Sequence, residues 1–111
     1  MRILRGDIVW ANFEQANGVS NLSRRPVLIL SHTVFNETSG TVIAVAVTEK
    51  EQKAGFPLTF ELNSKDFPQK MWVRISQART LSVDRIGEKI SHIKEDELAT
   101  IIEGFNEIIG G

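Results

Sequence analysis

The side chains with the clearest chemical potential stand at the ends of two apolar runs. Arg25 comes just before the run 27–30, and Thr48 comes just after the run 41–47. If these runs are neighbouring antiparallel strands, the start of one and the end of the next meet at one edge of a sheet. Arginine binds phosphoryl oxygens through a rigid fork of donors, and a threonine hydroxyl can donate to the same oxygens. The pair therefore predicts a site for a phosphodiester.

A second group of cationic and polar side chains follows in the stretch 72–80. It comprises Arg74, Ser76, Gln77, Arg79 and Thr80. RNA cleaves itself when a 2′-hydroxyl attacks the adjacent phosphorus. A protein needs only to orient that attack, move protons and stabilise charge on the phosphoryl oxygens. The alternative is that these arginines form surface ion pairs, and the residues alone leave both interpretations open.

Metal and cofactor chemistry have no recognisable motif in the sequence. There is no cysteine, and His32 and His92 each lack a second histidine or a carboxylate pair at ligand spacing. Glycine-rich phosphate loops, dinucleotide-binding loops and the nucleophile-elbow pattern are also absent from the sequence. We therefore expect a protein that uses neither a metal nor a cofactor.

Length and composition favour a small soluble protein, and the charge distribution leaves a local basic face open. The chain has 111 residues, which fits a single domain over 1–111, and a net charge of −1, which argues against a general nucleic-acid coat protein. The charge is +3 over residues 1–86 and −4 over 87–111. This division is compatible with a basic surface on the part of the protein formed by residues 1–86, or with a random distribution of charged residues. The start of the chain has no signal-peptide pattern and the apolar runs are too short to span a membrane, so we expect a cytoplasmic protein.

Hydrophobic patterning predicts a small, mostly antiparallel β domain. The expected strands are 8–13, 27–30, 41–47, 58–62 and 72–79, with a short edge strand at 90–93. Ser31 is the expected N-cap of a short helix within 31–39, and 81–89 is expected to be a connecting segment. In 72–79, strict alternation would send Val73, Ile75 and Gln77 to one face. The long polar loop 14–25 is typical of a functional loop.

A terminal helix from Lys94 is predicted to close the sheet. Its apolar side chains form one stripe: Leu98, Ile101, Ile102, Phe105, Ile108 and Ile109. Acidic residues in the first turn suit the helix dipole. A stripe this wide must cover either the sheet or a second subunit.

Several segments together resemble the MazF/PemK (Kid) family of bacterial toxin endoribonucleases. They are RGDIV at 5–9, RPVLI at 25–29, VFN at 34–36, the strand 41–48, and SQARTL at 76–81. Each segment alone is weak, but their order and spacing extend over nearly the whole chain.

The resemblance implies an SH3-like barrel with a C-terminal helix, a homodimer, and Arg25 with Thr48 as the catalytic pair. It implies a toxin that cleaves single-stranded mRNA at specific sequences without a metal, leaving a 2′,3′-cyclic phosphate and a 5′-hydroxyl. It also implies a labile MazE-like antitoxin whose flexible segment occupies the RNA groove. We expect Arg25 mainly to stabilise charge, because arginine is a poor proton shuttle in water, and a role in proton transfer stays open for a desolvated Arg25.

The expected RNA-binding residues lie in the first loop and in the stretch 72–80. They are Ser20, Asn21, Arg24, Arg74, Ser76, Gln77 and Arg79. Arg79 has an alternative, structural role at the strand end. Two positions depart from the family pattern. Leu22, Ser23 and Arg24 replace the usual glycines before the Arg-Pro pair, and Ser76 stands where some PemK-type members place an acid/base aspartate, which leaves the general base unassigned.

Two other functions remain open at this point. A non-enzymatic toxin that poisons gyrase, like the CcdB relatives, shares the fold but acts through its C-terminal helix. This chain has no tryptophan at that end, which counts against the gyrase interpretation. An inactive member that only binds its antitoxin is the third possibility.

Overall fold

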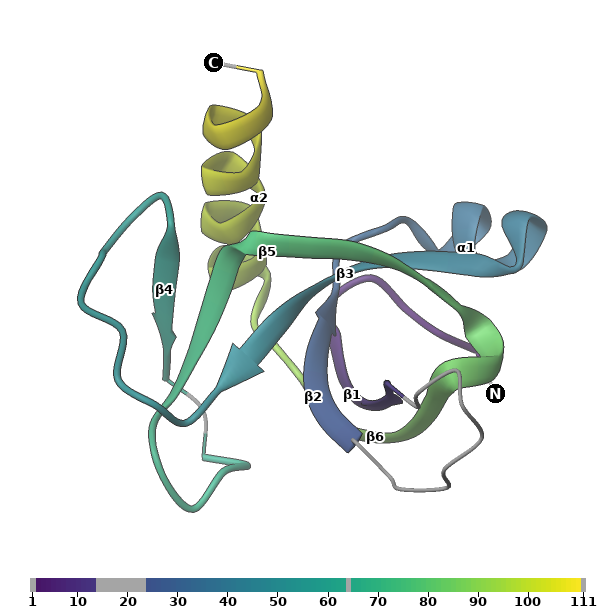
Figure 1. Ribbon diagram of the computed structural model, residues 1–111, viewed down its shortest axis with the longest axis horizontal. Helices are drawn as coiled ribbons and strands as arrows, with labels where there is room; N and C mark the ends of the chain where they lie inside the picture. The colour runs from purple at the N-terminus through teal and green to yellow at the C-terminus, as the bar shows by residue number, and fades with distance from the viewer. Residues whose placement is uncertain (1, 14–23, 64, 111) are drawn as a thin grey trace.

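The computed structural model describes residues 2–13, 24–63 and 65–110, and within them one antiparallel sheet and a C-terminal helix dominate. The sheet order is β4-β5-β3-β2-β1-β6. The elements are β1 (Asp7–Asn12), β2 (Arg24–Ile29), α1 (Thr33–Ser39), β3 (Thr41–Thr48), β4 (Thr59–Leu62), β5 (Met71–Ser82), the 3-10 turn η1 (Val83–Arg85), β6 (Ile86–His92) and α2 (Glu95–Ile109). The predicted class, mostly antiparallel β with a terminal helix, is confirmed (Figure 1).

Both faces of the sheet are apolar. Successive side chains of a strand point to opposite faces, and each face packs in its own buried cluster. On β2, Leu28 packs in the cluster that α2 covers, while its neighbours Val27 and Ile29 pack in a second cluster. The second cluster joins Val9 of β1 to Leu81 at the far end of β5, although these two strands are not paired. The sheet must therefore curl to bring its parts around one interior, and this curl is visible in Figure 1.

A wide bulge in β5 makes this curl possible. Ala46 of β3 pairs with Arg74, but its neighbour Val45 pairs with Ala78, so three residues of β5 have no counterpart on β3. An odd register shift sends every later side chain to the opposite face. Ile75 consequently packs under α2, whereas Leu81 packs in the second cluster.

The bulge corrects one expectation from the sequence. Gln77 does not share the buried face of Val73 and Ile75, because it lies in the bulge and is exposed. Simple alternation fails there since it assumes that the register is unbroken.

Other boundaries also differ from those predicted. β2 begins at Arg24, so both arginines belong to the strand, and 81–89 holds the end of β5 and the start of β6 as well as a connection. His32, rather than Ser31, caps α1, with its Nδ1 accepting from the N–H of Val34 at 3.3 Å. The hydroxyl of Ser31 is already engaged, because it accepts from the N–H of Ile43 at 2.9 Å.

The start of the chain is held by a buried carboxylate. Asp7 is 1% exposed, and its oxygens lie 2.7 Å from Nδ1 of His92, 3.2 Å from Nζ of Lys89, and 3.0 Å from the N–H of Leu4. A buried carboxylate is stable only when it is paired in this way. These contacts fix β1 against β6 and the segment that leads into α2.

The helix α2 covers the sheet along most of its length. Ile101 is buried, and Leu98, Ile102 and Phe105 pack on the same cluster. The stripe runs past the sheet at its end, where Ile109 is 64% exposed. Among the described residues, neither helix is long and apolar enough to cross a membrane.

The helix α2 is tightly packed at Gly104, and this packing generates a stability prediction. A Cβ there would lie 3.0 Å from Cε1 of Phe56, 3.1 Å from Cδ1 of Ile75 and 3.2 Å from the carbonyl oxygen of Pro57. We expect Gly104→Ala to lower the free energy of unfolding by about 1 to 3 kcal/mol, despite the better helix propensity of alanine. Urea unfolding measures this. Asn106→Ala, on the exposed side of the same helix, is the control, and equal or higher stability of Gly104→Ala would contradict the packing described.

Candidate active site

The candidate site opens where two strand pairs diverge. The ladder between β2 and β3 ends at Val27 and Ala46, but each strand remains paired to its other neighbour. β2 follows β1 as far as Arg24, and β3 follows β5 as far as Thr48. Continued pairing would set Arg25 opposite Thr48. Instead, both residues line one cavity of about 680 Å³ in the region where the strands separate.

Three guanidinium groups and two carboxylates line this cavity among the described residues. Arg24 and Arg25 come from β2, and Arg74 comes from β5, where its backbone pairs with Ala46. Glu49 and Asp66 are the carboxylates. The cations outnumber the anions, so the cavity favours an anionic group.

Thr48 is set to donate a hydrogen bond. Its Oγ1 accepts from the backbone N–H of Lys50 at 3.1 Å, which orients the hydroxyl. A hydroxyl that accepts from the backbone still has its own proton to donate. Arg25 forms no hydrogen bond or ion pair within the described ranges, so its donors are available to a ligand.

Two arginines, one of them already named as a lining residue, stack on aromatic rings. The guanidinium of Arg24 lies 4.7 Å from the ring centroid of Trp10, and that of Arg79 lies 4.6 Å from that of Phe13. Both rings line the cavity. These contacts hold the two cations at the cavity's edge and leave most of their donors unused.

The residues expected to bind RNA are only partly brought together. Arg24 and Arg74 line the cavity with Arg25 and Thr48, and Arg79 reaches its edge through Phe13. Ser76 and Gln77 are exposed in the β5 bulge and do not line it. Ser20 and Asn21 lie outside the described residues.

One wall of the cavity was not anticipated from the sequence. It is formed by Asp66, Phe67, Pro68 and Gln69, in the connection from β4 to β5. Contacts among its described residues anchor this connection. Ser91 donates to Asp66 at 2.6 Å, the side-chain amide of Gln69 donates to Glu49, and Glu97 accepts from the N–H of Asn63 at 3.0 Å. The only local signal was an aromatic residue followed by proline in a polar turn.

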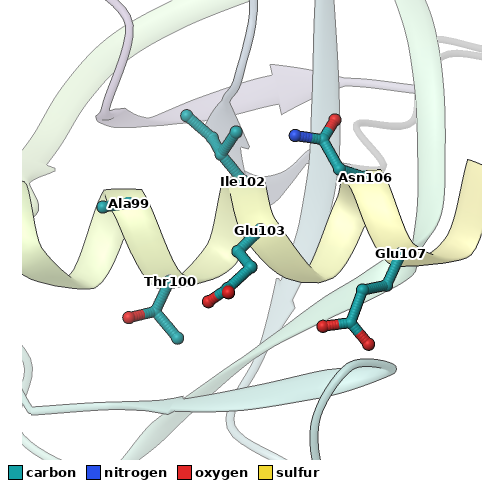
Figure 2. Close-up of a pocket in the computed structure, with 6 residues that line it drawn as sticks. All are labelled: Ala99, Thr100, Ile102, Glu103, Asn106 and Glu107. Atoms are coloured by element: carbon teal, nitrogen blue, oxygen red, sulfur yellow. The ribbon is translucent and has the colours of Figure 1, made fainter. Parts of the chain in front are cut away.

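A second hollow, on the outer side of α2, has the wrong charge for a phosphate. It is about 570 Å³ in volume, and Figure 2 shows Glu103 and Glu107 projecting to the same side of the helix. No cationic residue is among its described lining residues. The described residues also contain no group of three or more metal-binding side chains. Whether the chemistry is metal-free stays a prediction.

A protein family matches almost the whole chain. Residues 4–109 match the family described as the PemK-like, MazF-like toxin of type II toxin-antitoxin systems. The chain belongs to this family. The resemblance inferred from the short segments is thereby confirmed, and this MazF-like toxin has its strand-end arginine and threonine at one cavity.

Individual relatives agree with this assignment. The toxin is 30% identical over 105 residues to Endoribonuclease EndoA of Bacillus subtilis (strain 168), a match that covers 93% of this chain and 90% of that protein. Its structure is similar to that of MazE-MazF (Form-III) from Deinococcus radiodurans, with a TM-score of 0.82, 26% identity, and 99% and 98% of the two chains covered. An endoribonuclease in complex with its cognate antitoxin from Mycobacterial species, at 20% identity, supports the fold alone, with a TM-score of 0.80 over 97% and 95% of the chains.

The anchoring of the β4–β5 connection can be tested by removing one hydroxyl. Ser91 is buried and does not line the cavity, so Ser91→Ala removes its bond to Asp66 without altering the cavity's surface. We expect faster amide hydrogen exchange at Asp66, Phe67 and Gln69, since Pro68 has no amide hydrogen, and unchanged exchange in α2. Thr100→Ala, on the helix, is the control. Unchanged exchange at 66–69 would show that the wall is held by other contacts.

Proposed function

We propose that this MazF-like toxin is an endoribonuclease that cleaves single-stranded RNA by attack of a 2′-hydroxyl on the adjacent phosphorus. The products would be a 2′,3′-cyclic phosphate and a 5′-hydroxyl, and no metal is required. The observation that carries the proposal is the joint presence of Arg25, Thr48 and Arg74 around one cavity. Family membership and the EndoA relative support the same activity.

The catalytic pair would act on the phosphoryl group. Arg25 stabilises the negative charge that builds on the phosphoryl oxygens, and Thr48 donates to one of these oxygens and fixes the line of attack. Preorganised donors of this kind each contribute about 10²- to 10³-fold in rate. Both residues stand on ordered strands, which limits the reorganisation needed during the reaction.

The flanking nucleotides would use the remaining cations and the aromatic lining. Arg74 and Arg24 neutralise phosphates, and Trp10, Phe13 and Phe67 offer ring surfaces for bases. Arg79 would reach RNA at the edge of the cavity. For Ser76 and Gln77, the exposed bulge allows contact only with RNA that extends beyond the cavity, and roles for Ser20 and Asn21 remain predictions.

The partner that we propose for this toxin is the one named in the structure of a relative. Since the Deinococcus radiodurans structure is named MazE-MazF, we propose a MazE-like antitoxin for this toxin as well. We also propose a homodimer of a single-domain chain in the cytoplasm. Exposed Ile108 and Ile109 at the end of α2 support a second subunit, because they continue the apolar stripe beyond the sheet.

The assignment of Arg25 can be tested directly. Arg25→Ala should keep its secondary structure and unfolding midpoint but lose at least about 10²-fold in the rate of RNA cleavage in EDTA buffer. Arg2→Ala is the matched control, because Arg2 is exposed and pairs with Glu37 away from the cavity. A fully active Arg25→Ala would remove this residue from the mechanism. Intact RNA with the wild-type toxin, together with blocked DNA supercoiling by gyrase, would favour the gyrase-binding alternative.

A further inference from the structure

The proposed reaction needs a group that takes a proton from the 2′-hydroxyl, and the inference below rests on that reaction. Arg25 and Thr48 are poor bases, since one stays charged at physiological pH and the other is a neutral alcohol. Ser76, which replaces the aspartate of some relatives, lies in the exposed bulge and does not line the cavity. A group that accepts a proton more readily than these three residues is therefore the better candidate for the base.

Both histidines are engaged away from the cavity. His32 caps α1 through its Nδ1, and His92 lies against the buried Asp7. Neither lines the cavity. Among the described residues that line it, the groups able to accept a proton near neutral pH are the carboxylates of Glu49 and Asp66.

The two carboxylates differ in their surroundings. Asp66 accepts from the hydroxyl of the buried Ser91 at 2.6 Å, so it serves to anchor the β4–β5 connection. Glu49 directly follows Thr48 in the chain and is exposed at the end of β3. The side-chain amide of Gln69 donates to Oε2 of Glu49, and no bond to Oε1 occurs within the described part of the chain.

A carboxylate that is oriented by one neighbour and accessible through its second oxygen has the geometry of a general base. Gln69, which lies in the β4–β5 connection and also lines the cavity, supplies the orientation. Glu49 and Thr48 line the same cavity, so the carboxylate shares that cavity with the phosphate that Thr48 would bind. The cost of an anion near the phosphate is offset by three cationic side chains in the same cavity.

We propose that Glu49 is the general base of the cleavage step. Its carboxylate takes the proton of the 2′-hydroxyl while O2′ forms a bond to phosphorus. The bond between phosphorus and O5′ breaks, and O5′ leaves with the electron pair and takes a proton from water. The protonated Glu49 then returns its proton to solvent, so the residue is unchanged after one turnover.

The primary test measures single-turnover cleavage of one RNA by two variants. In each variant a glutamine replaces a glutamate, which removes the charge and keeps the shape of the side chain. Glu49→Gln should slow cleavage by about 10²- to 10⁴-fold and should still bind an RNA with a 2′-deoxy group at the scissile nucleotide. Glu51→Gln is the matched control, because Glu51 is exposed two residues away and does not line the cavity. A wild-type rate for Glu49→Gln would overturn the assignment. Absence of cleavage by the wild-type toxin would instead overturn the proposed function.

A modified substrate separates a base from an acid. When sulfur replaces the bridging O5′, the leaving group needs no proton, so a general acid becomes dispensable. The defect of Glu49→Gln should persist on this RNA, and its disappearance would show that Glu49 acts on the leaving group. Asp66→Asn should be less impaired than Glu49→Gln on the unmodified RNA. If Asp66→Asn loses more, Asp66 is the base and the proposal is wrong.

Discussion

The site depends on one feature of the sheet, namely the end of the β2–β3 ladder at Val27 and Ala46. Beyond that point each strand stays hydrogen-bonded to its other neighbour, β2 to β1 and β3 to β5. The two strand pairs diverge as ordered units, and the cavity forms in the region between them. Since backbone polar groups of separated strands need solvent or a ligand, this is a natural location for a polar substrate.

Packing on both faces of the sheet maintains that divergence. α2 holds one face through Ile101 and its neighbours, and the second cluster draws β1, β2, β3 and β5 around a common interior. The β5 bulge links the two clusters, because its odd register shift lets one strand supply Ile75 to the first and Leu81 to the second. The cavity lies where β2 and β3 separate, and residues of both clusters line it. The rigidity needed for phosphoryl chemistry comes from this packing, not from the cavity residues themselves.

Sequence patterns predicted the parts of this structure that depend on local periodicity. The strand-end positions of Arg25 and Thr48 follow from two apolar runs, and the cover that α2 gives the sheet follows from a single stripe. The β5 bulge was not predictable from local periodicity. It lets one strand pack side chains in two separate hydrophobic clusters, which depends on tertiary packing. Exposure of Gln77 follows from that bulge. The hydrogen bond between Glu49 and Gln69 also depends on tertiary packing, since Glu49 lies in the β3–β4 connection and Gln69 in the β4–β5 connection.

The central claim is that Arg25 and Thr48 act together on one phosphoryl group in one cavity. A double-mutant cycle in RNA cleavage, with Arg25→Ala, Thr48→Val and both changes combined, tests that claim most directly. Residues that act on the same group are strongly non-additive, so the double variant should be little slower than the slower single variant. If the two rate losses simply multiply, Arg25 and Thr48 act independently, and the shared site described here is contradicted.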